Sequence, residues 1–502
     1  MAKKIAQLEA RLEELAEQNK ALRTENKLLH QKVQHLLGRI FGRKTEQIDP
    51  AQLQLLMGIA ADTEDHNDDD DPPPSSPSPG RKKRRKSKPR IPEDVPTEDI
   101  NIDPDEVKDS PNDYKRIGEE VTQELDVIPA QYIRRRFIRG KYVKKEDLQA
   151  APIIAPLPER LIEGGYASAG IIADVVTKKY VDHLPLYRQE RILKDRFGID
   201  LSRQTMSEWV RSASDWLGPI YRQIRENMRL KNYLQVDESP VKYCDKEGPP
   251  GGSQGYFWVF YDPLGKEVFY QWHTGRSAKC LDDVLKDFKG TVQCDGYGAY
   301  TSYAKDKADI DIACCWAHAR RKFHEARDEA PAVAGWFLKH IQHLYGVESE
   351  LRTAGADPET TRKVRQRDCK WRLNLLHKAL QGLMSRYLPR TQMGKAIHYT
   401  LGHWDKLIKY SSNGKIRIDN NGVENTIRPT ALGKKNWLFI GHPKAGDRSA
   451  VLYTILENCR KLGINPQEYL KDVLSRLPSM KMKDVDQLIP AKWLEARKKT
   501  AA

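Results

Sequence analysis

Residues 233–244 read YLQVDESPVKYC, and three more apolar segments follow: YFWVFYDP at 256–263, KEVFYQWH at 266–273 and GTVQCD at 290–295. β-Branched and aromatic runs that Gly and Pro interrupt are typical of strands. Between the last two runs, LDDVLKDF at 281–288 predicts a short helix. Three antiparallel-type strands, a helix and a further strand therefore predict a mixed α/β core.

Three carboxylates in or near these segments are the candidate catalytic residues. Asp237 follows the apolar run LQV, Asp295 follows TVQC, and Glu424 lies in IDNNGVENTIRP at 418–429, an Asn-rich start to a short helix. We expect each Asp at the end of a buried strand. Such carboxylates can converge on two Mg²⁺ ions, which favour oxygen ligands and serve in-line attack at phosphate. The alternative is that they are ordinary surface or capping acids among the 70 in the chain.

The composition points to a polyanionic partner. The chain has 502 residues, a formal net charge of +15 and seven cysteines without a C-x-x-C pair. A basic chain of this length suggests two to four units and a nucleic-acid partner. The sequence contains no run of 18 apolar residues, so we expect no membrane-spanning helix. The amino terminus is rich in acids, so we do not expect it to be a signal peptide. Scattered cysteines indicate reduced thiols in a cytosolic protein.

The amino-terminal 45 residues carry a heptad repeat. Leucine recurs every seventh residue, at Leu8, Leu15, Leu22, Leu29 and Leu36. Asn19 and Asn26 lie in the second seam, where buried Asn pairs set the register of a parallel two-stranded coil. We predict a leucine-zipper-like dimer; the alternative is an amphipathic helix that packs on its own domain. Residues 62–90 then lack apolar side chains, which predicts a disordered linker with an acidic and a basic half.

A helix-turn-helix pattern lies within 159–225, a region that we predict to be helical throughout. In this pattern Gly198 makes the turn and Ser202 caps the second helix. The second helix would present Arg203, Gln204 and Ser207 to a major groove. Many helical hairpins contact no DNA, and that alternative stays open.

Further cations and a histidine lie between and after the carboxylates. Residues 327–410 are too long for a loop and predict a helical insertion. Cys315-Trp-Ala-His318 is a C-x-x-H element without the second pair that structural zinc needs. Candidate phosphate contacts are Arg276, Arg320, Arg321, Lys322, Arg428, Lys434 and Lys435. Pro429 is expected to kink or end the helix of Glu424.

Several motifs of this sequence resemble those of the DDE transposases of the bacterial insertion-sequence-66 family. They are LGRIFGRKTEQID at 37–49, VDESPVK around Asp237, CDGYGAY around Asp295, CWAHARRKF at 315–323, DNNGVENTIRP around Glu424, GKKNWLFIG at 433–441 and INPQEYLKDVLSRLP at 464–478. The resemblance implies an RNase H-like catalytic domain, with which the order of predicted strands agrees. It implies Asp237, Asp295 and Glu424 as catalytic metal ligands, ahead of the neighbouring acids Glu238 and Asp419.

The resemblance also bears on cofactors. It implies two Mg²⁺ ions, with Mn²⁺ able to substitute. Relatives bracket the segment corresponding to 118–142 with cysteine pairs, which this chain lacks, so we expect no zinc and assign no zinc ligand. C-x-x-H elements recur near the active site of several such lineages. His318 is therefore predicted either to contact the scissile phosphate or metal shell, or to be a structural histidine.

The expected units are 1–45, a coiled coil; 62–90, a disordered linker; 91–150, a degenerate zinc-knuckle-like module; 159–225, a helical DNA-binding region; 231–326 with 415–445, the RNase H-like core; 327–410, the helical insertion; and 446–502, a C-terminal helical element.

The resemblance predicts a transposase that binds element ends, cleaves DNA and joins the 3′ ends to target DNA. Its expected partners are double-stranded DNA, further copies of the chain bound through the coiled coil, and accessory proteins of the same element. The expected setting is the bacterial cytoplasm, at the nucleoid. A DNA-binding repressor that has lost catalysis, or a metal-dependent nuclease that cuts without joining, are the alternatives.

Overall fold

The computed structural model describes residues 131–142, 153–245 and 252–501. All of them belong to one compact unit, Pro129–Ala502. The predicted coiled coil and linker, and most of the predicted 91–150 module, lie outside the described residues. Within that module the strand β1 (Lys141–Tyr142) is described, and it pairs with β2 (Ile153–Ile154), which follows the module. None of the helices in the described ranges is long and apolar enough to cross a bilayer.

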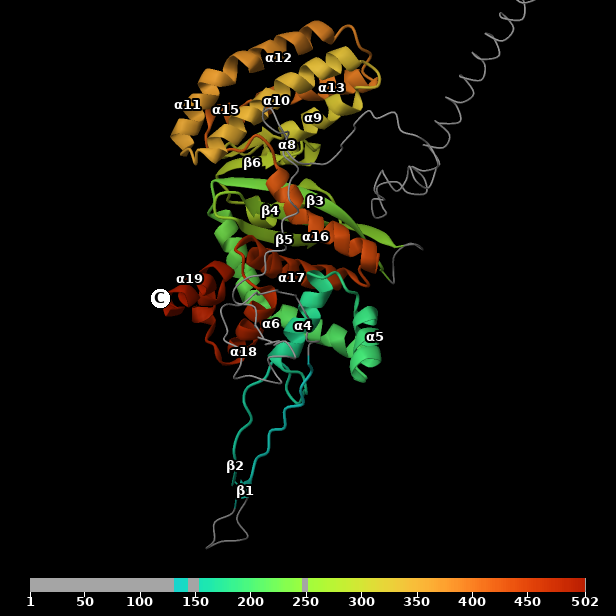
Figure 1. Cartoon of the computed structure of the whole chain (residues 1–502), viewed down its shortest axis with the longest axis vertical. Coiled ribbons are helices and arrows are strands. Elements are labelled where there is room, and N and C mark those ends of the chain that lie inside the picture. Colours follow the sequence, from blue (N-terminus) through green and yellow to red (C-terminus); the bar gives the residue numbers. More distant parts are fainter. Residues whose placement is uncertain (1–130, 143–152, 246–251, 502) are drawn as a thin grey trace, which may run out of the picture. The chain divides into compact units, whose positions relative to one another are not determined.

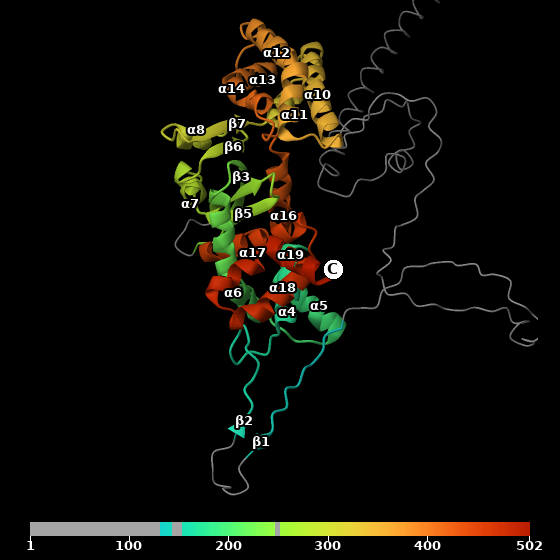
Figure 2. The same cartoon turned by 90° about the vertical axis from the view of Figure 1, so that its left-hand side faces the viewer.

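A five-stranded mixed sheet forms the centre of this unit, in the order β5-β4-β3-β6-β7 (Figures 1 and 2). The strands are β3 (Tyr233–Tyr243), β4 (Ser253–Asp262), β5 (Glu267–His273), β6 (Gly290–Cys294) and β7 (Ile310–Cys314). β3, β4 and β5 pair antiparallel, whereas β6 and β7 run parallel to β3. The predicted α/β class and the predicted run of three strands, a short helix (α7, Asp282–Leu285) and a further strand are confirmed.

The strand β3 differs from the prediction. It continues past Asp237 to Tyr243, so the expectation that Asp237 ends a strand is wrong. β3 pairs with β6 only as far as Gln235↔Gln293, while its pairing with β4 continues to the end. Asp237 thus lies just after the point where β3 stops pairing with β6, in a part of β3 that is still paired with β4. Asp295 follows the last residue of β6, as predicted.

Three helices precede the sheet: α4 (Ala169–Tyr180), α5 (Leu186–Phe197) and α6 (Arg203–Arg229). Gly198 ends α5 with φ of 65°, and the Ser202 hydroxyl caps α6 by accepting from the Thr205 amide at 3.2 Å. Because a left-handed residue and a capping serine suit these positions, the two helices follow the predicted pattern. Residues 159–168 are not helical, so the prediction of helix throughout 159–225 is wrong there.

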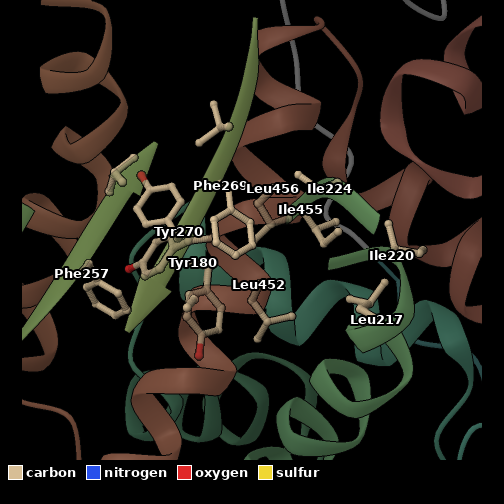
Figure 3. Close-up of a cluster of buried hydrophobic side chains, with 14 of the residues drawn as sticks. Tyr180, Leu217, Ile220, Ile224, Phe257, Phe269, Tyr270, Leu452, Ile455 and Leu456 are labelled. Carbon is tan, nitrogen blue, oxygen red and sulfur yellow. The ribbon is translucent and has the colours of Figure 1, made fainter. Parts of the chain in front are cut away.

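The β5 edge of the sheet is covered by α17 (Pro443–Lys461). Asn458 both donates to the Val268 carbonyl and accepts from the Val268 amide, and Thr454 accepts from the Tyr270 amide. These side chains satisfy backbone groups that an edge strand would otherwise expose. Beneath them, aromatic residues of β4 and β5 pack against aliphatic residues of α6 and α17 (Figure 3). The chain closes with α18 (Pro466–Arg476) and α19 (Pro490–Ala501).

A group of helices separates β7 from the segment of Glu424. After α9 (Trp316–Glu325) come α10 (Pro331–Thr353), α11 (Pro358–Asp368), α12 (Lys370–Leu383), α13 (Gln392–Gly402), α14 (Trp404–Leu407) and α15 (Lys409–Ser412). We call α10–α15 the helical insertion. Its core contains Arg365, 2% exposed, whose guanidinium donates to both Glu348 carboxylate oxygens at 2.6 Å. The same guanidinium donates to the carbonyls of Tyr410, Asn413 and Ile416.

The helix of Glu424, α16 (Asn421–Trp437), is longer than predicted. It continues through Pro429, so the expectation that this proline ends the segment is wrong. The helix ends where Leu438 adopts φ of 65°.

Candidate active site

The sheet register places the two aspartates side by side. Gln235 of β3 is paired in parallel with Gln293 of β6, and each Asp follows two residues later. Because side chains of a strand alternate between faces, Asp237 shares a face with Gln235, and Asp295 continues from Gln293 on that same face. The two carboxylates therefore leave neighbouring strands at the point where these strands diverge.

α16 brings Glu424 to this face. The Tyr270 hydroxyl of β5 donates to the Thr426 carbonyl of α16. Gly422 lies so close to the sheet that an added Cβ would be 2.6 Å from both the Gln235 amide oxygen and the Tyr261 ring. Glycine is needed for this close approach, which sets the first turn of α16, and hence Glu424, against β3 and β4 (Figure 1).

The carboxylates influence each other. Burial is the largest cause that raises the pKa of Asp237 well above its ordinary value. The negative charges of Glu238, Asp295 and Glu424 raise the pKa of Asp237 further. Burying several carboxylates without a cation costs folding free energy. Groups of acids whose pKa values are shifted in this way occur often at functional sites.

His318 and Cys315 complete one side of the cluster. His318 Nδ1 lies 3.7 Å from Glu424 Oε1, and Arg321 Nη2 lies 3.9 Å from Glu424 Oε2. Burial lowers the pKa of His318, against the opposing effect of the Glu424 carboxylate. The Cys315 thiol, which accepts from the Asn420 amide, has a ligand atom within 4.8 Å of those of His318 and Glu424. This is a possible ion site among the described residues.

Several buried polar atoms at this place have no hydrogen-bond partner. They are both side-chain amide atoms of Asn420, Nδ1 of His318 and Oε1 of Glu424. Buried polar groups in folded proteins nearly always have partners, and exceptions point to water, an ion or a catalytic role. These orphaned atoms lie on the Glu424 side of the site, where the ligand atoms within 4.8 Å of one another are those of Cys315, His318 and Glu424 and not those of the two aspartates.

The two rival acids have other partners. Glu238 points to the opposite face of β3, where it accepts from Arg276 Nε at 2.7 Å and from the Tyr300 hydroxyl of α8 (Gly298–Ala304). Asp419 accepts from the Asn421 amide at 3.3 Å, and burial raises its pKa. Arg276, a candidate phosphate contact, is thus committed to Glu238, with its guanidinium 3.8 Å from the Tyr297 ring centre.

The remaining predicted cations divide into two groups. Arg320 and Arg321 are exposed on α9, and Arg428 and Lys435 are exposed on α16. Lys322 and Lys434 are half-buried: the Lys322 ammonium lies 4.8 Å from the Tyr399 ring centre, and Lys434 donates to the Pro240 carbonyl. Arg203, Gln204 and Ser207 are exposed at the start of α6, an element separate from this cluster.

Sequence reasoning missed the residues that support the carboxylates. Tyr399 of α13 donates its hydroxyl to the Asp295 carbonyl, so the helical insertion contacts the second aspartate directly. Gln235 and Gln293 hold the segment that leads to Glu424. A Gln-x-Asp pattern occurs at both strands, in QVD at 235–237 and QCD at 293–295, and was the available signal.

Comparison with known proteins identifies the family. A family model described as "Transposase IS66 family" matches residues 164–448, which includes every carboxylate discussed above. The chain belongs to the IS66 transposase family. A model of the IS66 C-terminal element matches 454–491, and one described as "Transposase C of IS166 homeodomain" matches 28–100. The last match covers part of the predicted coiled coil and the whole predicted linker, and a homeodomain is a DNA-binding element.

Relatives in Sinorhizobium fredii (strain NBRC 101917 / NGR234) align with most of this transposase-family chain. The uncharacterized protein y4jD is 30% identical over 424 residues, 80% of this chain and 81% of the relative. The uncharacterized protein y4hP is 27% identical over 501 residues, 93% of this chain and 89% of the relative. The similarity therefore extends well beyond the segment that carries the carboxylates.

Proposed function

We propose that this chain is a DDE transposase with an RNase H-like core that cleaves DNA at the ends of its element and joins the 3′ ends to target DNA. The observations that support the proposal are the adjacent strands from which Asp237 and Asp295 follow, and the negative charges of Asp295 and Glu424, which both raise the pKa of Asp237. Membership of a transposase family supports the same reaction class.

Asp237, Asp295 and Glu424 are the residues that would hold two Mg²⁺ ions, or Mn²⁺ in their place. When bound, such a pair activates the attacking water or 3′-hydroxyl and stabilises charge on the leaving oxygen. His318 and Arg321 lie on the Glu424 side, where they would orient that carboxylate and face the DNA phosphate. The exposed cations Arg320, Arg428 and Lys435 would contact neighbouring phosphates, which position DNA without reading its sequence.

The partners follow from this reaction. Double-stranded DNA is the substrate, as element ends and as target, and the net charge of +15 suits it. Joining two ends requires at least two copies, for which the heptads of residues 1–45 provide a means. We propose further that the chain acts at the bacterial nucleoid and that accessory proteins of the same element assist it.

A strand-transfer assay with labelled element ends tests the proposal. Asp237→Asn, Asp295→Asn and Glu424→Gln should each abolish cleavage and joining, because residues that act as a unit give non-additive losses. DNA binding, measured by mobility shift without metal, should persist in all three. Glu238→Gln is the matched control, since this neighbouring buried carboxylate faces Arg276 on the other side of the sheet.

The outcomes separate the alternatives. Cutting without joining would make the chain a nuclease, and binding by the wild-type chain without either step would make it a repressor. Cleavage by Glu424→Gln at the wild-type rate would remove Glu424 from the site and make Asp419 the next candidate.

A further inference from the structure

Two buried glutamines connect the strands of the aspartates to the helix of the glutamate. Gln235 Nε2 donates to Gln293 Oε1 at 2.9 Å, so the side chains of β3 and β6 bond each other across the sheet. Tyr233 joins them, because its hydroxyl also donates to Gln293 Oε1, at 2.6 Å. All three side chains are at most 2% exposed. They form one polar layer on the same face of the sheet as the aspartates, two residues earlier along each strand.

This layer holds the backbone that leads to Glu424 at four points. Gln293 Nε2 donates to the Arg417 carbonyl at 2.8 Å, and the Arg417 amide donates to the Tyr233 hydroxyl at 3.0 Å. Gln235 Nε2 donates to the Asp419 carbonyl at 2.7 Å. The Val423 amide donates to Gln235 Oε1 at 3.2 Å, one residue before Glu424.

Glutamine has the chemistry that these positions require. A primary amide donates and accepts at once, whereas a carboxylate only accepts and a hydrocarbon does neither. Gln235 and Gln293 each use both functions, since each donates to a carbonyl of the Glu424 segment and accepts from another group. Replacement of Gln235 removes the donor of the Asp419 carbonyl, and replacement of Gln293 removes the donor of the Arg417 carbonyl, which favours movement of the segment.

We infer that Gln235 and Gln293 are positioning residues that set Glu424 relative to Asp237 and Asp295, and thereby set the affinity of the site for divalent cations. The inference rests on the proposed function, in which these three carboxylates hold the cations. Each glutamine precedes its aspartate by two residues, so one pair of strands carries both the ligands and the groups that fix the distance to the third ligand. Functional sites tolerate displacements of only about 0.5 Å.

Direct binding of Mn²⁺ to the full-length protein, followed by electron paramagnetic resonance, tests this without reference to activity. Gln235→Met and Gln293→Met keep the length of the side chain, add no charge and remove the bonds. We expect Mn²⁺ affinity to fall by about 10- to 100-fold, the usual effect of losing a group that orients a ligand. Unchanged affinity in folded Gln235→Met and Gln293→Met proteins would overturn the inference.

The matched control is Gln189→Met. Gln189 is also buried and donates to two backbone carbonyls, those of Val175 and Leu184, but it lies on α5. It should lower thermal stability and leave Mn²⁺ affinity unchanged. An equal loss of affinity in this control would mean that any buried amide has the same effect, which contradicts a positioning role.

Tyr233→Phe is a milder variant in case the methionine variants do not fold. It removes the bonds from the Arg417 amide and to Gln293. Because the bonds from both glutamines to the Arg417 and Asp419 carbonyls remain, we expect a smaller fall in Mn²⁺ affinity, of about 3- to 10-fold. Wild-type affinity in a folded Tyr233→Phe protein would count against the inference.

A double-mutant cycle with Glu424→Gln separates the inference from the proposed function. If Gln293 acts through Glu424, Gln293→Met should cause no further loss of Mn²⁺ affinity in the Glu424→Gln background. Fully additive losses would show an independent effect and refute the positioning role. If Glu424→Gln alone left Mn²⁺ binding intact, the metal assignment itself would be wrong.

Discussion

Replacement of Arg365 by methionine should destabilise the helical insertion far more than replacement of a similar arginine on the same helix. Arg365 is 2% exposed and makes two bonds to Glu348 and three to backbone carbonyls. Arg365→Met leaves Glu348 buried without its cation, which costs about 3–5 kcal/mol. The three carbonyls lose their donor as well, so we expect the upper part of this range.

Urea unfolding followed by circular dichroism measures the effect, with free energies from linear extrapolation. Arg362 is the control, because it also pairs with a glutamate, Glu359, through Nε and Nη2 but on the exposed face of α11. Exposed pairs contribute little, so Arg362→Met should leave the unfolding midpoint unchanged. Equal losses in Arg365→Met and Arg362→Met would refute the reasoning that burial decides the cost.

Three further predictions concern other parts of the chain. Because burial raises the pKa of Asp237, stability falls as the pH rises from the ordinary carboxyl pKa to the raised folded pKa, and the loss is complete above the folded pKa. Metal-free Asp237→Asn should therefore melt above the wild type at about pH 8 and close to it at about pH 4, by calorimetry. Asn458→Leu should lower the free energy of unfolding by about 2–5 kcal/mol, because it leaves both Val268 backbone groups unpaired, and urea titration checks this. Deletion of residues 1–45 should lower the oligomeric order, and an unchanged mass in light scattering would contradict the coiled coil.

The sequence predicted the class of the fold because strand-forming runs are local. Apolar runs that end in Gly, Pro or Asp marked β3 to β6, and Asp295 follows its strand as expected. Asp237 was misplaced because the end of β3 is decided by β4, which keeps pairing after β6 has diverged. Pro429 does not end α16 because this helix packs on the sheet, and tertiary contacts maintain a helix that a proline alone would disfavour.

The candidate site was only partly visible in the sequence. The three carboxylates stand out because acids beside buried strands are costly, and the structure brings their elements together. The bonds of Gln235 and Gln293 depend on strand register and on a segment more than 120 residues away from either glutamine, as the Gln293 to Arg417 bond spans 124 positions. The pairing of Glu238 with Arg276 likewise depends on which face of β3 each residue occupies. Such long-range contacts leave no local pattern.

The cover that α17 provides for β5 has a consequence for copies of this gene that lose their 3′ end. A stop codon between those for Glu424 and Pro443 would leave all three carboxylates in the product and remove Thr454 and Asn458. The amides and carbonyls of β5 would then be open to strands of other chains, which favours aggregation. The presence of Asp237, Asp295 and Glu424 in a shortened reading frame therefore does not indicate a folded, active product.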